Sequence, residues 1–195
     1  MTVIHLDFAH RARLAPTTQP VLAEPGSASP APDAVLAAYA ASSDSLFESV
    51  GDAVLALMSA QTLPEILSLV VHEWPHLLGV DAAGVALAAH DSGFRFGPGG
   101  VAPVPARRVR AWRGGAAGPS IREARGDVPL FGPAAGPIRT VGIVPLDLPE
   151  PLGCGVLALG SREVAAPAAL AGAERLGFLG EALSRMIARC QTTAY

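Results

Sequence analysis

Two short apolar runs near the C-terminal end of the chain, joined by a link too short to hold a helix, constrain the fold most strongly. The first run, Ile138–Leu146, is apolar on both faces, and the second, Gly155–Gly160, is a continuous apolar run typical of a central strand. The link over residues 147–153 has the length and proline content of a hairpin loop. Because parallel neighbours need a long crossover connection, these two strands are expected to pair antiparallel.

A further strand is predicted over Ala82–His90, an apolar run that ends at an Asp-Ser-Gly turn signal. Phe94–Phe96 is the candidate for its hairpin partner. The segment 97–137 is rich in glycine, proline and arginine, and within it 104–112 and 120–125 are candidates for short helices. The middle of the chain is therefore the part whose structure the sequence constrains least.

Three stretches carry apolar residues at spacings of three and four, which places these residues on one face of an amphipathic helix. The stripes are Leu46, Val50, Val54, Leu57 and Met58, then Leu63 to Leu78, and finally Leu176 to Cys190. Helices that precede and follow strands joined by short loops are typical of an α+β domain, in which an antiparallel sheet carries helices on one side. The sequence therefore predicts this fold class rather than a doubly wound sheet.

Local start and stop signals frame the first two of these helices. Ser45 with Glu48, and Thr62 with Glu65, have the spacing of capping boxes, in which each side chain accepts a hydrogen bond from an otherwise unpaired backbone N–H. A proline also stands in the first turn of the second helix, where its missing N–H costs nothing. Gly79 is placed to end that helix in the left-handed conformation.

The N-terminal part of the chain has a different composition. Residues 11–32 contain five prolines and show no apolar period, so we expect residues 1–32 to be a disordered or extended leader. For residues 1–10 a short strand and no structure both remain open. Residues 33–195 have the length of a single domain.

The ionisable composition excludes several classes of function. All 14 basic residues are arginine, so no lysine is present to form a Schiff base, to bind phosphate in a P-loop or to act as a general base. A net charge of −3 gives no footprint for nucleic acid or an anionic membrane, and the basic cluster Arg107–Arg113 is expected to be a solvated helix or loop face.

The sequence shows no targeting segment and no cysteine motif. The N-terminus lacks the pattern of a signal peptide, and no uninterrupted apolar stretch is long enough to span a bilayer, so a cytoplasmic location is expected. Cys154 and Cys190 lie far apart in apolar segments, without the spacing of a zinc finger. Both are expected to be buried free thiols.

The segment His72–His76 matches the H-E-x-x-H motif, in which two histidines one helical turn apart bind zinc and the glutamate deprotonates a bound water. Pro75 lies between the two candidate ligands and disturbs the backbone that would hold them in register. The third-ligand position of the longer metzincin motif is an alanine. We therefore predict no metal site, with His72 and His76 on the polar edge of a core helix and Trp74 packed beneath; a zinc-dependent hydrolase is kept as an alternative.

No other set of catalytic residues is identified. There is no G-x-S-x-G elbow, and no histidine follows His90, so a serine or cysteine triad would need its base from the first half of the chain. The glycines of 153–160 lead into a strand, where a dinucleotide fingerprint requires a helix. The chain is therefore predicted not to be an enzyme.

The segments Leu57–Leu67 and Leu78–Leu87 resemble the opening of a GAF domain. More narrowly, Ile143–Leu146 and Gly155–Arg162, followed by an amphipathic helix, resemble the bacterial family called domain of unknown function 484; the likeness covers roughly residues 45–190 and is lost directly after Arg162. The resemblance implies a GAF-like antiparallel sheet of about five to six strands with helices packed on one face. It also implies that the helices form a dimer bundle and that the other face holds a pocket.

On this basis we predict a non-catalytic regulatory or sensory module that binds a small molecule, needs no cofactor and forms a homodimer through its helices. The variable middle of the chain is expected to cover a pocket lined by Trp112, Arg122, Phe131 and Arg139. The alternative is a pocketless protein-interaction scaffold, for which a filled sheet face and an exposed apolar helix surface would be the signs. The sequence leaves the ligand and any protein partner open.

Overall fold

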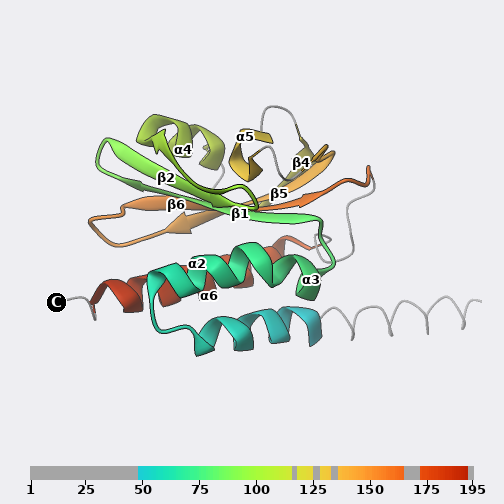
Figure 1. The fold of residues 1–195 in the computed structure, drawn as a ribbon, viewed down its shortest axis with the longest axis horizontal. Helices are drawn as coiled ribbons and strands as arrows, with labels where there is room; N and C mark the ends of the chain where they lie inside the picture. The colour runs from blue at the N-terminus through green and yellow to red at the C-terminus, as the bar shows by residue number, and fades with distance from the viewer. Residues whose placement is uncertain (1–47, 116–117, 125–127, 133–135, 165–171, 193–195) are drawn as a thin grey trace, which may run out of the picture.

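The computed structural model describes residues 48–115, 118–124, 128–132, 136–164 and 172–192, which form the layered arrangement of Figure 1. The predicted leader over 1–32 and the predicted cap residue Ser45 lie outside these ranges. Within them the protein is an α+β domain, as the sequence predicts. One antiparallel sheet lies between a layer of long helices and a layer of two short helices.

Six strands form the sheet in the order β3-β2-β1-β6-β5-β4, and every pair is antiparallel. The strands are β1 Ala82–Ala89, β2 Ser92–Gly97, β3 Gly100–Pro105, β4 Ser120–Glu123, β5 Thr140–Asp147 and β6 Cys154–Ser161. The hairpin predicted from the two apolar runs is confirmed as β5–β6, with Val144 opposite Leu157. The predicted strand at Ala82 and its hairpin partner are confirmed as β1 and β2.

Both edge strands differ from the sequence prediction. A short helix is predicted over 120–125, but residues 120–123 form β4, with Ser120 opposite Ile143 on β5. Four residues are too few for a period to be read, so the pairing with β5 decides the conformation. β3 is absent from the sequence prediction because it carries two prolines, which strands tolerate mainly at a sheet edge.

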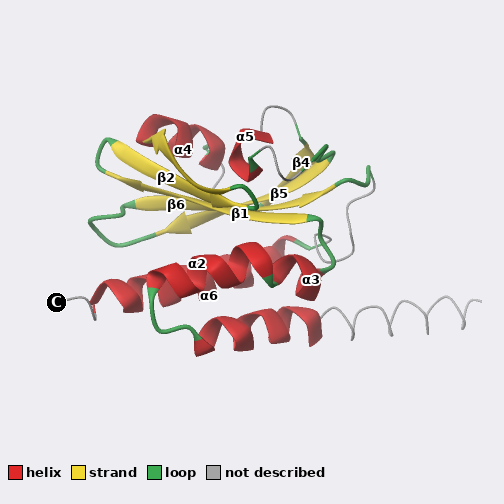
Figure 2. Cartoon of the chain, in the orientation of Figure 1, coloured by secondary structure: helices red, strands yellow, loops and turns green. Residues whose placement is uncertain are grey.

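One face of the sheet, called the helical face here, is covered by α2 Leu63–His72, α3 Trp74–Leu78 and α6 Ala173–Thr192. A further helix over residues 48–59 lies outside α2 and α6 as a third layer (Figures 1 and 2). The helices and the strands share one core, in which Leu57, Ile66 and Leu179 are fully buried. Met58, predicted on the same buried stripe, is instead 57% exposed, because it lies one residue past Leu57 and so about 100° further round the helix.

The start of α2 is the predicted capping box. The Glu65 backbone N–H donates to Thr62 Oγ1 over 3.4 Å, and the Thr62 N–H donates to Glu65 Oε2 over 3.3 Å. The prediction of one continuous helix to Leu78 is wrong, because α2 ends at His72 and α3 begins at Trp74. Proline in the first turn of α3 has no N–H to continue the ladder, and its ring excludes the carbonyl one turn earlier. Gly79 ends α3 at φ 62°, as predicted.

The opposite face of the sheet, called the α4/α5 face here, is covered by two short helices, α4 Ala106–Arg113 and α5 Val128–Phe131. Figure 2 shows both on the side of the sheet away from the long helices. The short helix predicted over 104–112 is confirmed as α4. The long helices therefore share one face, as predicted, while the variable middle of the chain supplies the cover of the other.

Candidate functional site

The α4/α5 face, where the sequence predicts a pocket, is occupied by the protein's own side chains. Trp112 on α4 is 7% exposed, and Leu130 and Phe131 on α5 are fully buried. They pack with strand residues that are mostly small, and this cluster also includes Ala82, Ala86, Ala88, Val141, Ile143, Val156 and Ala158. The described residues thus form a second core here.

Two glycines in the sheet measure how closely this layer approaches. A Cβ added to Gly160 would lie 2.8 Å from Phe131 Cζ and 3.1 Å from Ile138 Cγ2. A Cβ added to Gly84 would lie 3.0 Å from Leu130 Cδ2. Phe131 and Leu130 therefore rest directly on the backbone of the central strands, and an added methyl group would require these side chains to shift.

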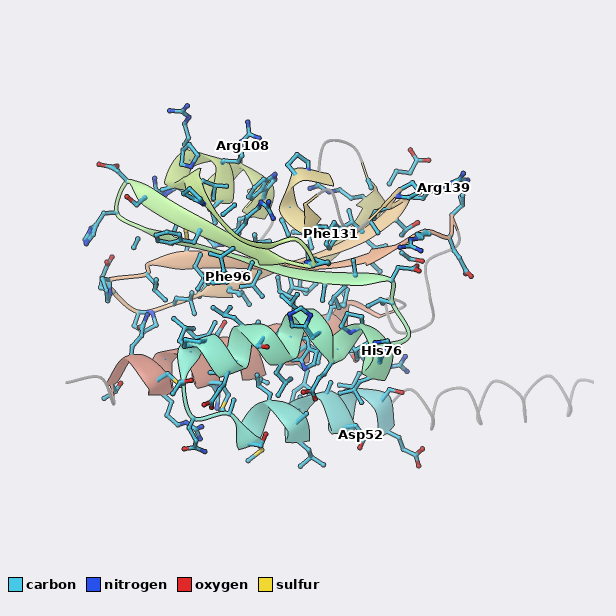
Figure 3. The ribbon with its side chains drawn as sticks, in the orientation of Figure 1. Asp52, His76, Phe96, Arg108, Phe131 and Arg139 are labelled. Carbon is cyan, nitrogen blue, oxygen red and sulfur yellow. The ribbon has the colours of Figure 1, made fainter. Side chains whose placement is uncertain are left out.

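Of the four predicted pocket residues, the structure brings two together. Trp112 and Phe131 belong to the same buried cluster. Arg122 is exposed on the edge strand β4, and Arg139 is exposed just before β5, at the end of the sheet in Figure 3. The backbone of Arg139 is held by its N–H, which donates to Ser161 O over 2.8 Å. Contact of any of the four with a ligand stays a prediction.

Arg95 is a residue of this face that the sequence analysis does not single out. It lies on β2 opposite Ala86, so its side chain crosses the α4/α5 face. Its Nη1 is buried and has no hydrogen-bond partner in the described part of the chain. The backbone of Gly132, at φ 79°, approaches so closely that an added Cβ would lie 2.8 Å from that nitrogen. The Phe-Arg-Phe alternation of β2 is the sequence signal that marks this arginine.

A groove of about 390 Å³ lies on the helical side, between α2 and the β2–β3 hairpin. Leu67 and Val71 line one wall, and Phe96 and Val101 line the other. Its volume and its apolar lining fall within the range of small-molecule sites. His72 stands at this groove, one turn after Ser68, which supplies a second polar group.

The outermost helices form a second apolar feature, called the outer helical surface here. Between the helix of residues 48–59 and α6 runs a groove of about 440 Å³. Two exposed apolar side chains line it, Met58 at 57% and Phe178 at 54% exposed, and Leu55 on the same helix as Met58 is 66% exposed. Beside them Arg185 Nε donates to Glu181 Oε1 over 2.7 Å, as an ion pair one turn apart on α6.

The H-E-x-x-H segment does not have the geometry of a metal motif. His72 ends α2 and His76 lies in α3, so the two histidines are on different helices, and both are exposed. Figure 3 shows His76 at the end of the helical layer. Within the residues described, no three His, Cys, Asp or Glu side chains gather as metal ligands would. Trp74 packs beneath as predicted, fully buried, with Nε1 donating to Ala53 O over 3.0 Å.

The arginine cluster is an exposed helix face, as predicted. It lies on α4, where Arg108 stands over the ring of Trp112 with 6.0 Å between guanidinium carbon and ring centroid. Arg110 Nη2 donates to His90 O over 2.8 Å, and Arg113 forms an ion pair with Asp147. The contacts of Arg110 and Arg113 tie α4 to His90, at the turn after β1, and to Asp147, at the end of β5, whereas the Arg108 contact lies within α4 itself.

The two cysteines are free thiols but only half-buried, so the expectation of full burial is wrong. Cys190 lies on the outer part of α6, where its Sγ approaches Gln61 O at 3.4 Å. Cys154 begins β6 at the rim of the sheet. In both cases the residue sits at the end of an element, where the covering layers thin out.

Among the helices described, none combines the length and the hydropathy of a bilayer-crossing segment.

No protein-family model and no curated protein sequence matches this chain. Solved structures do. The chain is similar to the free methionine-R-sulfoxide reductase of Neisseria meningitidis, at 18% identity and a TM-score of 0.55, over 76% of this chain and 91% of that one. It is also similar to the chromophore-binding domain of the bacteriophytochrome RpBphP3 from R. palustris, at 14% identity and a TM-score of 0.53.

The second match covers 78% of this chain but only 63% of the phytochrome chain. A GAF domain from Pseudomonas syringae pv. tomato also matches, at 16% identity and a TM-score of 0.46, over 82% of this chain and 94% of that domain. At such identities the likeness concerns the fold, which is GAF-like, and nothing of activity. The narrower resemblance to family 484 stays a prediction.

Proposed function

We propose that this chain is a non-catalytic regulatory module that acts by pairing with a second copy through its outer helical surface. The filled α4/α5 face carries the proposal. Phe131, fully buried, packs directly on the sheet, so that a Cβ added to Gly160 would lie 2.8 Å from its Cζ. Of the functions that the sequence leaves open, a protein-interaction scaffold is therefore favoured over small-molecule sensing at that face.

The outer helical surface supplies the means of association. Met58 and Phe178 are each more than half exposed and line the same groove, and Leu55, also more than half exposed, lies on the same helix as Met58. Contiguous exposed apolar groups of this kind mark interaction sites in soluble proteins. A self-complementary patch on a symmetric dimer buries the same residues of both copies, so one surface is sufficient. The Glu181–Arg185 pair is neutral and adds no repulsion between copies.

The association is tested on the full chain by sedimentation equilibrium. The wild-type protein is expected to be dimeric, and Phe178→Glu is expected to raise the dimer dissociation constant at least about tenfold, because it places a charge in the contact. Val101→Glu is the matched control, since Val101 is 63% exposed but lies on β3. A monomeric wild-type chain, or equal loss in both variants, would refute the proposal.

A second function, binding of a small apolar molecule, is favoured by the groove beside α2. Its volume of about 390 Å³, its apolar walls and the polar groups of Ser68 and His72 suit such a ligand. Thermal unfolding in the presence of nucleotides and of apolar compounds tests this function. A ligand at 100 times its dissociation constant adds about 2.7 kcal/mol of stability. Ser68→Trp, which fills the groove, should abolish any such shift; a shift that persists in this variant excludes the groove as the site.

A further inference from the structure

A polar pocket of about 420 Å³ lies at one end of the sheet, apart from the two grooves described above. Three segments that are distant in the sequence line it, namely the turn after β1, the last turn of α4 and the loop between β5 and β6. The lining residues are His90, Arg110, Arg113, Glu150, Leu152, Gly153 and Cys154. Its volume falls in the lower part of the range for small-molecule sites.

Arg110 is the cation of this pocket whose charge is not compensated. Arg113, one turn further along α4, forms an ion pair with Asp147. Arg110 instead donates from Nη2 to the backbone carbonyl of His90 over 2.8 Å, and among the residues described no carboxylate pairs with it. A guanidinium carries five N–H donors. The bond to His90 O therefore holds the side chain in place and leaves donors for an anion.

Glu150 is the anion of the same pocket, and it too has no partner. Its Oε1 lies 3.6 Å from the position that a Cβ on Gly153 would take, so the carboxylate lies beside the backbone of the loop. It forms neither an ion pair nor a hydrogen bond within the described part of the chain. Arg110 and Glu150 thus line one pocket with opposite charges but do not pair with each other.

The two unpaired charges restrict the class of ligand. A simple anion that approaches Arg110 meets the repulsion of Glu150, and a simple cation that approaches Glu150 meets that of two arginines. A molecule that carries both charges satisfies both side chains at once. The half-buried Leu152 and Cys154 add a less polar wall, which suits an apolar substituent.

We propose that this pocket binds a small zwitterion of amino-acid type with an apolar side chain. The ligand carboxylate accepts hydrogen bonds from the guanidinium of Arg110, in the bidentate geometry that arginine favours. The ligand ammonium donates to Glu150, and the side chain lies against Leu152. Binding would connect α4 to the β5–β6 loop a second time, beside the Arg113–Asp147 pair. The pocket shares no residue with the outer helical surface, so the inference is independent of the proposed dimerisation.

The test is a titration of the isotope-labelled full chain with L-leucine, followed by the shifts of backbone amide resonances. Saturable shifts are expected at His90 and Gly153, on two of the segments that line the pocket. Arg110→Gln should raise the dissociation constant at least about tenfold, the cost of losing charge-assisted hydrogen bonds. Glu150→Gln should raise it about three- to tenfold. Arg107→Gln is the matched control, because Arg107 is exposed on α4 but does not line the pocket.

Two compounds that each lack one charge of leucine assign the contacts. Isocaproate, without the ammonium, should bind more weakly than leucine and lose affinity in Arg110→Gln but not in Glu150→Gln. Isopentylamine, without the carboxylate, should show the reverse dependence. If Arg110→Gln acted only by distorting the pocket through His90, it would weaken isopentylamine as well. Thermal unfolding of each variant checks that the fold is retained, which is expected because both side chains are exposed.

The possible outcomes decide the inference. Leucine binding that both substitutions weaken, with opposite dependences for the two half-ligands, supports a zwitterion site. Absence of saturable shifts with leucine overturns the inference. Leucine binding that Glu150→Gln leaves unchanged also overturns it, because the pocket would then recognise an anion alone. A chain that is monomeric but binds leucine in this way refutes the proposed dimerisation and leaves the pocket supported.

Discussion

The two faces of the sheet are filled by opposite combinations of residue size. On the helical face the strands contribute large side chains, such as Val85, Leu157 and Leu159, to a core shared with long helices. On the α4/α5 face β1 and β6 turn small residues outwards, and the bulky groups Trp112 and Phe131 come from the covering helices. Both faces reach close packing, as protein interiors do, but the volume comes from opposite layers.

This difference teaches that a sheet surface of small residues is not by itself a pocket. Gly160 and Gly84 leave space above the sheet, and Phe131 and Leu130 occupy it. It also predicts unequal resistance to opening, because α4 and α5 have 8 and 4 residues, whereas α6 has 20. The side chains of α4 and α5 should therefore shift to accommodate an added methyl group at a lower cost in stability than those of the helical face.

The largest effect is expected from the buried tryptophan of the helical face. Trp74→Ala removes a fully buried ring and the hydrogen bond from Nε1 to Ala53 O, which ties α3 to the helix of residues 48–59. We expect a loss of about 3–5 kcal/mol in the free energy of unfolding. Urea denaturation measures it, with Trp112→Ala as the matched substitution on the other face. An equal or greater loss in Trp112→Ala would contradict the proposed asymmetry.

A smaller loss is expected from a glycine at the contact between α6 and the sheet. A Cβ added to Gly180 would overlap Val144 Cγ1 on β5. In a helix interior, replacing glycine by alanine normally stabilises by about 1 kcal/mol. Here overpacking should reverse the sign, and Gly180→Ala should lower the free energy of unfolding by about 2 kcal/mol. The double variant with Val144→Ala should recover part of that loss; no recovery would show that another contact is responsible.

The corresponding glycine on the α4/α5 face tests whether its cover yields. Gly160→Ala places a Cβ 2.8 Å from Phe131 Cζ. Because Phe131 is carried by a helix of four residues, we expect the ring to shift and the loss to stay at about 1 kcal/mol. Phe131→Leu in the same chain should remove the penalty. A loss larger than that of Gly180→Ala would mean that the α4/α5 layer is the more rigid of the two.

The parts of this fold that the sequence predicts are those decided by local chemistry. Two helix signals need only neighbouring residues, and both are observed: the capping box of Thr62 and Glu65, and the end of α3 at Gly79. The β5–β6 hairpin follows from two runs and a short link. The break after His72 is also decided locally, because Pro75 lacks the backbone N–H that a continuous helix would need.

The candidate site depends on contacts between distant parts of the chain and is therefore harder to predict. That Phe131 rests on Gly160 follows from where α5 crosses β6, which no local pattern specifies. The exposure of Met58 depends on which side of its helix meets α6. β4 exists because β5 offers an edge, and its own four residues carry too little pattern to indicate it.

The smallest effect on stability is expected at the start of α2, which is capped by side-chain hydrogen bonds. On the other face, α4 begins after Pro105 without such a cap. The Gln61 backbone N–H donates to Glu65 Oε2 over 2.7 Å, and this bond, with a weaker one from Thr62, lowers the pKa of Glu65 below its usual 4.5. A lowered folded-state pKa means stabilisation that is present above the unfolded pKa and lost as pH falls through the folded one. The stability difference between the wild type and Glu65→Gln should therefore be constant near neutral pH and shrink in acid. Denaturation at a series of pH values measures it, with Glu174→Gln as the control in the first turn of α6. A difference that does not change with pH would mean that the cap acts by geometry alone, without the carboxylate charge.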